Sequence, residues 1–291
     1  MATPTHLHTA LDPRLNAFRT DLAASTLKGQ VEAEHFVDGT PASVRAPVTA
    51  LRRAPHSDAA RDSELLFGEA VRVLEDRNGW SWVQAVRDSY VGYVLSADLM
   101  AGETAPTHRI AATRTFVYQD ADIKSPALTW LSLNSPLTLT GQEGPFSALA
   151  GGGHVVTAHI RAREEAASDY VRVAEALLET PYLWGGRSSL GLDCSGLVQC
   201  ALEAAGMRCP RDTDMQEVAL GAPVAEKQPL QRGDLIFWKG HVGIMRDATT
   251  LLHATATHMK TVLEPVEPTI ARIAQSDGPV TSIRRLPALA A

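Results

Sequence analysis

The chain contains few cysteines. Its 291 residues include only Cys194, Cys200 and Cys209. Their spacing matches neither a disulfide framework nor a zinc-binding pattern, and the histidines outside positions 241 and 253 show no coherent ligand spacing. We therefore predict no metal and no cofactor. Three free thiols are typical of a reducing compartment.

The sequence also lacks long apolar runs and clusters of basic residues. No stretch approaches about 18 consecutive apolar residues, so no membrane-spanning helix and no membrane partner are predicted. With 27 basic and 33 acidic residues the formal net charge is −6, which argues against nucleic acid as a partner. No glycine loop of the P-loop or dinucleotide-binding type occurs, and residues 151–153 are predicted to form a turn.

The first residues lack an export signal. Residues 1–14 contain no basic segment followed by an apolar core. We therefore expect a cytoplasmic protein that acts on imported fragments. Export remains the alternative if a longer precursor carries a signal.

The length and the 45% hydrophobic content suit two or three domains. Residues 1–42 are predicted to be an irregular or short-helical lead segment. Residues 43–102 contain short alternating segments, and Asn78-Gly79 is a strong hairpin signal, so a small SH3-like barrel is predicted. The segments are 43–51, 70–74, 80–86 and 90–94.

Residues 103–162 repeat this style less clearly and are predicted to form a second, degenerate SH3-like barrel. Trp80, Trp82 and Trp130 are assigned to barrel cores, because the aromatic rings of barrel strands are usually buried. Residues 163–291 form the remaining domain, which carries the chemistry.

A thiol lies at the predicted start of a helix. The sequence Asp193-Cys194-Ser195-Gly196 is followed by an apolar stripe over residues 197–205, and Gly206 supplies the stop. The first turn of a helix favours thiolate over thiol, and its free N–H groups can bind an oxyanion. Cys194 is therefore a candidate nucleophile.

Two histidines are candidates for the matching base. Residues 234–238, 241–245 and 251–255 are predicted as three antiparallel strands joined by tight turns. His241 and His253 then lie on neighbouring strands, where one can accept a proton and the other can orient it, a triad without a carboxylate.

These motifs, taken in order, resemble the signature of the NlpC-type cell-wall cysteine peptidases. The resemblance spans about residues 165–285 and implies a papain-like α+β catalytic domain that hydrolyses peptide stems of peptidoglycan. It is carried by Pro181-Tyr182-Leu183-Trp184-Gly185-Gly186, Asp193-Cys194-Ser195-Gly196, Pro210-Arg211-Asp212-Thr213, Gly233-Asp234, His241-Val242-Gly243 and His253-Ala254.

The resemblance also implies roles for individual residues. It makes Cys194 the nucleophile, His241 the general base and acid, and His253 the third polar residue. The Tyr182 hydroxyl is implied to stabilise the oxyanion or place the substrate. The positions implied to bind small muropeptides are Asp193, Ser195 and Thr213.

The first barrel resembles bacterial SH3-like domains that accompany these peptidases. In members acting on free muropeptides, an acidic residue and a tyrosine of this domain clamp the free amine of an N-terminal L-alanine. Tyr90 matches the tyrosine, and Glu69 is the candidate carboxylate, with Glu64 second and Asp88 as a substitute. The implied reaction cleaves the γ-D-glutamyl–diamino acid bond of such stem peptides, as in murein peptide recycling.

Two alternatives stay open from the sequence. One is an exported wall endopeptidase that uses its SH3-like domains to dock on peptidoglycan. The other is a non-catalytic muropeptide-binding protein on a degenerate peptidase fold, against which the full set of Cys194, His241 and His253 argues.

Overall fold

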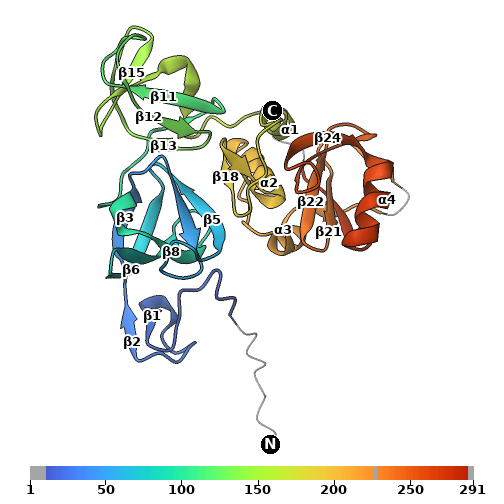
Figure 1. The fold of residues 1–291 in the computed structure, drawn as a ribbon, viewed down its shortest axis with the longest axis horizontal. Helices are drawn as coiled ribbons and strands as arrows, with labels where there is room; N and C mark the ends of the chain where they lie inside the picture. Colours follow the sequence, from blue (N-terminus) through green and yellow to red (C-terminus); the bar gives the residue numbers. More distant parts are fainter. Residues whose placement is uncertain (1–10, 226–227, 288–291) are drawn as a thin grey trace, which may run out of the picture.

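The structure is a computed structural model that describes residues 11–225 and 228–287. The α+β class predicted from the sequence is confirmed: three β-rich stretches precede a domain in which helices cover a sheet (Figure 1). The lead segment contributes β1 (Leu22–Ala24) and β2 (His35–Val37), which pair in parallel, and a short 3-10 turn at Ser25–Leu27.

The first β unit is a seven-stranded sheet in the order β5-β4-β8-β7-β6-β3-β9. The Asn78-Gly79 turn joins β6 to β7 with both residues at positive φ, as the hairpin signal predicts. The strands are β3 (Thr40–Val44), β4 (Val48–Arg52), β5 (Arg61–Leu66), β6 (Ala70–Arg77), β7 (Trp80–Ala85), β8 (Val91–Leu95) and β9 (Leu99–Ala101), with a 3-10 turn at Ser96–Asp98 before β9.

Two expectations for the β units need correction. Residues 43–51 form two strands instead of one, because the chain breaks at Pro47, which has no N–H to donate to a ladder. Of the three tryptophans assigned to barrel cores, only Trp82 is buried, whereas Trp80 and Trp130 are partly exposed. The guanidinium of Arg19 lies over the Trp82 ring, 4.4 Å from its centroid.

The second β unit consists of a three-stranded sheet, β13-β10-β17, and a five-stranded sheet, β12-β11-β16-β15-β14. A 3-10 turn at Thr157–His159 precedes its last strand. The strands are β10 (His108–Ile110), β11 (Arg114–Tyr118), β12 (Ala127–Ser132), β13 (Pro136–Leu137), β14 (Leu139–Glu143), β15 (Phe146–Leu149), β16 (His154–Val156) and β17 (Ile160–Ala162).

The remaining domain is built around a six-stranded antiparallel sheet in the order β20-β25-β21-β22-β23-β24. Its elements are α1 (Tyr170–Glu175), β18 (Arg187–Ser188), β19 (Gly191–Leu192), α2 (Cys194–Ala204), α3 (Thr213–Ala219), β20 (Ala222–Pro223), β21 (Leu235–Trp238), β22 (His241–Met245), β23 (Thr250–Thr255), β24 (Lys260–Pro265), α4 (Val266–Ser276) and β25 (Ser282–Arg285). The three strands predicted around the histidines are therefore present as β21, β22 and β23.

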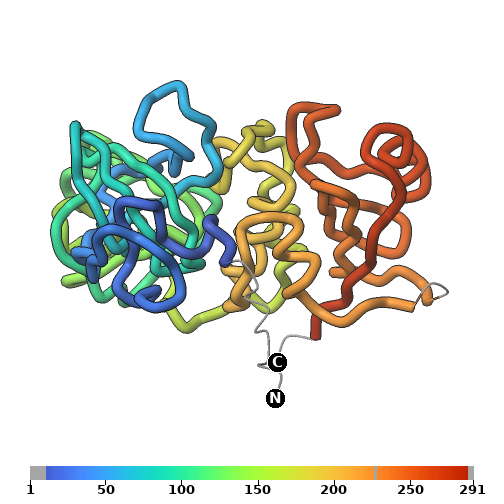
Figure 2. The backbone as a smooth tube through the Cα atoms, turned by 90° about the horizontal axis from the view of Figure 1, so that it is seen from below, coloured from blue at the N-terminus to red at the C-terminus, as the bar shows by residue number. Residues whose placement is uncertain are grey.

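Alternation along these strands gives the sheet two apolar faces. On one face Phe237 and Ile244 pack against α1 and α2, and on the other Ile236 and Met245 pack against α4. Figures 1 and 2 both show α2 lying between the N-terminal β units and the sheet. The helix that begins at Cys194 thus lies between the sheet of its own domain and the N-terminal β units. In the described part of the chain, no helix is both long enough and apolar enough to cross a membrane.

Candidate active site

Asp193 fixes the start of α2. Its Oδ1 accepts a hydrogen bond from the backbone N–H of Gly196 at 2.7 Å, which is the usual way to cap a helix. Its Oδ2 accepts from the buried guanidinium of Arg211 at 2.6 Å and from the N–H of Gly185 at 2.9 Å. Ser195 joins the same cluster, since Arg211 Nη1 donates to its Oγ at 2.8 Å. These contacts hold the residues on both sides of Cys194 in place.

The Cys194 thiol is enclosed where α2 faces the sheet. Its Sγ lies 3.8 Å from Thr213 Oγ1 and 3.9 Å from the carbonyl oxygen of Gly240, the residue before His241. Among the hydrogen bonds of the described residues, none joins this sulfur to the His241 ring. The sulfur at the start of α2 therefore lies beside the turn that leads into β22, next to the position of His241 in the chain.

The protonation states differ from the thiolate expected from the sequence. Burial, with the nearby negative charge of Asp193, raises the pKa of Cys194 to about 11. Burial, with the neighbouring His253 and Arg272, lowers the pKa of His241 to about 3. Burial therefore favours the neutral form of both groups. The helix start does not offset the cost of burying the charge.

His241 and His253 contact each other as the strand pairing predicts. His241 Nε2 lies 2.8 Å from His253 Nδ1. His253 is fully buried, and its Nε2 lies 2.7 Å from Glu264 Oε2. The site thus includes a carboxylate that the sequence reasoning missed. No sequence signal pointed to Glu264, because its position depends on the strand register: Val262 pairs with His253, and Glu264 lies two residues further along β24 on the same face.

A cleft of about 610 Å³ opens over the sulfur and is shared by three parts of the chain. Cys194, Tyr182, Asp193, Ser195 and Thr213, all predicted from the sequence, line it together. Burial and the nearby Cys194 and Asp193 raise the pKa of the Tyr182 hydroxyl, so this hydroxyl stays protonated and can donate a hydrogen bond. Further lining residues come from the lead segment and the first β unit: Pro13, Arg14, Phe18, Arg19, Arg53, Asp62, Trp82, Tyr90, Val91, Gly92 and Tyr93.

Tyr90 reaches this cleft from the first β unit. Its hydroxyl donates a hydrogen bond to Asp212 Oδ2 at 2.9 Å, and Arg14 Nη1 donates to the same oxygen at 2.8 Å. Arg14 also binds Asp214, with 2.7 Å between Nη2 and Oδ2. The sequence reasoning assigned no substrate contact to Asp212 and did not consider Arg14. Neither was foreseeable, because the contacts join residues 122 and 198 positions apart.

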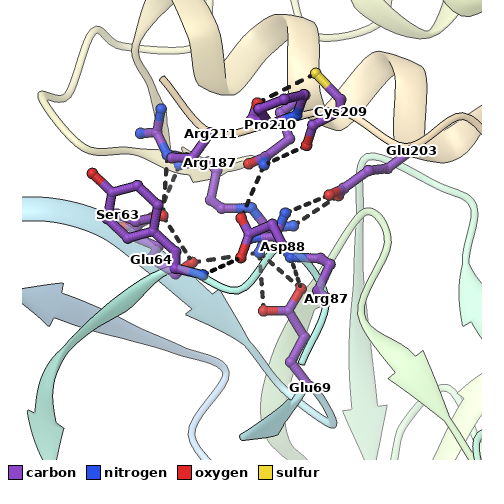
Figure 3. Close-up of polar contacts among 12 residues, drawn as sticks. Ser63, Glu64, Glu69, Arg87, Asp88, Arg187, Glu203, Cys209, Pro210 and Arg211 are labelled. Atoms are coloured by element: carbon purple, nitrogen blue, oxygen red, sulfur yellow. Dashed lines mark hydrogen bonds and ion pairs between the residues drawn. The ribbon is translucent and has the colours of Figure 1, made fainter. Parts of the chain in front are cut away.

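Glu69, the predicted amine-binding carboxylate, lies elsewhere. It is absent from the cleft lining, and both its oxygens accept from Nη1 of the buried Arg187, at 2.8 and 3.0 Å (Figure 3). The guanidinium of Arg87 lies 3.2 Å away. The carboxylate therefore compensates buried arginines where the first β unit meets the catalytic domain. This placement contradicts its predicted role in the cleft.

The two substitutes for Glu69 belong to the same interdomain network (Figure 3). Glu64 accepts from the backbone N–H of Arg187 at 3.0 Å. Asp88 pairs with Arg87 at 2.7 Å and accepts from Gln199 of α2 at 3.1 Å. Arg187 also binds Glu203 of α2 at 2.9 Å. This network ties the first β unit to the helix that carries Cys194.

Comparison with known proteins divides the chain in the same way. Residues 51–99 match the model of the bacterial dipeptidyl-peptidase Sh3 domain, and residues 179–272 match that of the NlpC/P60 family. Among solved structures, an NlpC/P60 family protein from Bacillus cereus superposes with a TM-score of 0.73 at 19% identity, covering 86% of this chain and all of the other. That likeness confirms the fold.

Two curated relatives extend over both domains. Dipeptidyl-peptidase 6 of Lysinibacillus sphaericus is 29% identical over 240 residues, which cover 74% of this chain and 87% of the relative. Gamma-D-glutamyl-L-lysine dipeptidyl-peptidase of Bacillus subtilis is 28% identical over 228 residues, covering 69% and 74%. The similarity thus includes the SH3-like domain as well as the domain with the thiol.

Proposed function

We propose, on the premise that this chain belongs to the NlpC/P60 family of cysteine peptidases, that it cleaves the γ-D-glutamyl–diamino acid bond of peptidoglycan stem peptides that begin with a free L-alanine. The observation that carries this proposal is the Tyr90–Asp212 hydrogen bond at 2.9 Å in the cleft of Cys194. The names of the two relatives, a dipeptidyl-peptidase and a gamma-D-glutamyl-L-lysine dipeptidyl-peptidase, support cleavage at the γ-D-glutamyl bond.

The charge around Asp212 favours a positively charged ligand. Asp12, Asp212 and Asp214 all contact the guanidinium of Arg14, while Arg211, whose charge also acts on Asp212, is paired with Asp193. Burial raises the pKa of Asp212 and outweighs the hydrogen bond from Tyr90 and the charges of Arg211 and Arg14. An ammonium group at this position supplies the missing charge. We therefore assign the amine subsite to Asp212 and Tyr90 in place of Glu69 and Tyr90.

This subsite distinguishes free peptides from intact wall. The alanine of polymeric wall is amide-linked and carries no charge, so its binding leaves the carboxylate of Asp212 uncompensated. Arg14 and Pro13 of the lead segment line the same cleft, close to the subsite. The carboxylate of Asp212 and the lead segment beside it both favour peptides whose N-terminal residue is the alanine.

The reaction proceeds through an acyl-enzyme. Cys194 Sγ attacks the γ-carbonyl carbon of D-glutamate while its proton passes to His241. Backbone N–H groups at the start of α2 and the Tyr182 hydroxyl hold the oxyanion, and each such donor lowers the barrier by about 3–4 kcal/mol. His241 then protonates the leaving amine of the diamino acid, the C–N bond breaks, and a thioester remains. Water, activated by His241, attacks the thioester and releases L-Ala-D-Glu.

The contacts between domains bear on the alternative of a wall-docking module. The first β unit uses Tyr90 for the cleft and Glu69 for the interdomain network, so this face is not free to bind wall polymer. This supports a role on small muropeptides, and we propose that the enzyme serves murein peptide recycling in the cytoplasm.

A digest analysed by mass spectrometry tests the proposal. L-Ala-γ-D-Glu-diaminopimelate is compared with its N-acetylated form and with purified sacculi, using Cys194→Ala as the inactive control. We expect the free tripeptide to release L-Ala-D-Glu much faster than the N-acetylated form is cleaved, and the sacculi to stay intact. Equal cleavage of the N-acetylated peptide removes the free-amine specificity, and cleavage of sacculi in preference to the tripeptide supports the wall endopeptidase instead.

A further inference from the structure

Three side chains from successive strands form a continuous row that begins at His241. His241 of β22 contacts His253 of β23, with 2.8 Å between Nε2 and Nδ1. His253 in turn contacts Glu264 of β24, with 2.7 Å between Nε2 and Oε2. The first two members were expected from the sequence. The third has no role in the reaction described above.

Glu264 is held as an ionised acceptor. Arg272 of α4 donates to its Oε2 at 2.6 Å, and His258 Nε2 lies 3.2 Å from its Oε1. Burial favours the neutral acid, but the hydrogen bonds from both histidines and the charge of Arg272 outweigh it and lower the pKa of Glu264. An ionised carboxylate can only accept hydrogen bonds.

We propose that Glu264 is a positioning residue that fixes the tautomers of His253 and His241 so that the Nδ1 atom of His241 is the proton acceptor for Cys194. The inference rests on the roles given to Cys194 and His241 under the proposed function. It follows from the direction in which each hydrogen bond of the row must run.

The direction is set from the carboxylate outwards. Because Glu264 only accepts, the hydrogen between it and His253 belongs to Nε2 of that ring. A neutral imidazole carries one hydrogen, so His253 Nδ1 is a bare acceptor. His241 Nε2 must then donate to it, which leaves His241 Nδ1 without a hydrogen. Burial lowers the pKa of both histidines, so the neutral forms on which this argument depends prevail at pH 7.

The alternative tautomer is unsuited to the reaction. If His253 carried its hydrogen on Nδ1, His241 Nε2 would be the acceptor, and His241 would carry its hydrogen on Nδ1. That nitrogen could no longer take the proton of Cys194. Orientation of a base by a carboxylate that itself stays ionised is the arrangement of the serine-protease triad. Here an additional imidazole lies between carboxylate and base.

Nuclear magnetic resonance of the full chain with ¹⁵N-labelled histidine tests the inference without any substrate. The wild-type protein is expected to show the hydrogen on Nε2 in both rings, assigned with His241→Ala and His253→Ala. In Glu264→Gln, whose amide both donates and accepts, the second tautomer is expected to appear. His258→Ala, which removes the other contact to the same carboxylate, is the matched control and is expected to keep the wild-type pattern.

Kinetics supply the second measurement. Glu264→Gln is expected to lower kcat on the tripeptide about 10- to 100-fold with little change in KM, since the base and not the substrate contacts are affected. A wild-type ring with its hydrogen on Nδ1, or a Glu264→Gln protein with unchanged tautomers, overturns the inference. Failure of the wild-type enzyme to cleave the tripeptide concerns the proposed function alone, because the spectra do not depend on it.

Discussion

Arg187 and Glu69 form a buried ion pair between the catalytic domain and the first β unit, with 2.8 Å between Nη1 and Oε1. Arg187 follows Gly185 and Gly186 and lies seven residues before Cys194 in the sequence. Its Nη2 atom binds Glu203 of α2, the helix that begins at Cys194. The pair therefore links the position of the SH3-like domain to the position of Cys194.

Glu69→Gln is expected to destabilise the protein by about 3–5 kcal/mol, because it leaves Glu203 and Asp88 to compensate the two buried arginines Arg187 and Arg87. Unfolding in urea, followed by tryptophan fluorescence, measures the change. Glu179→Gln is the control: it removes the partner of Lys260 in an exposed pair, and a loss below about 1 kcal/mol is expected. Similar losses of unfolding free energy in both variants would show that the buried interdomain pair stabilises the protein no more than an exposed pair does.

The same variant separates structure from specificity. Since Glu69 does not line the cleft, Glu69→Gln is expected to change the rates on free and N-acetylated tripeptides by the same factor. A loss of rate on the free tripeptide alone would instead indicate that Glu69 binds the free amine of the substrate.

Asp212→Asn is expected to raise KM for the free tripeptide about 10- to 100-fold, because a charged hydrogen bond to the ammonium is lost. The rate on the N-acetylated peptide should stay unchanged. Steady-state kinetics on both peptides checks this, with Asp247→Asn as a control in an exposed turn far along the chain. Parallel losses on the two peptides would contradict an amine-binding role.

The pH dependence of kcat/KM is expected to be flat between about pH 5 and 9. Because burial holds the pKa of His241 at about 3, the base remains unprotonated as the pH falls through the ordinary range of imidazole. Because burial raises the pKa of Cys194 to about 11, the thiol keeps the proton that the leaving amine needs. Initial rates in overlapping buffers measure the profile. An acid limb near about pH 6.5 would instead indicate a thiolate–imidazolium pair.

Cys194→Ala is expected to abolish turnover and to leave the unfolding midpoint within a few degrees of wild type. The side chain is small, and the polar contacts of its sulfur, to Thr213 and Gly240, are long, so its removal costs little hydrogen bonding and creates only a small cavity in the surrounding core. A thermal melt and a tripeptide assay on the same preparation check both statements. Residual turnover would assign the nucleophile to another residue.

The parts of the site that depend on local sequence signals were predictable. The apolar stripe and Gly206 set the ends of α2, and tight turns set the strands of the histidines, so the prediction that His241 meets His253 is confirmed. The family resemblance is also confirmed. Residues 193–195 and Thr213 were placed correctly at the cleft for the same reason, although their roles toward substrate stay predictions.

The remaining features depend on how distant segments meet. Glu69 and Asp212 are both acidic residues next to turns, and only the docking of the two domains decides which one faces the cleft. Glu264 requires the register of β24 against β23, and the neutral state of Cys194 requires the degree of burial. Composition and periodicity contain none of this information.

The cleft takes its walls from the lead segment, the SH3-like domain and the catalytic domain, so it does not exist until all three have come together. Without the lead segment and the SH3-like domain, the catalytic domain retains Cys194 but lacks the cleft-lining residues that those two parts contribute, Arg14 and Tyr90 among them. Selectivity and completed assembly thus arrive in the same step. Substrate selection by this cleft therefore depends on the docking of these three parts.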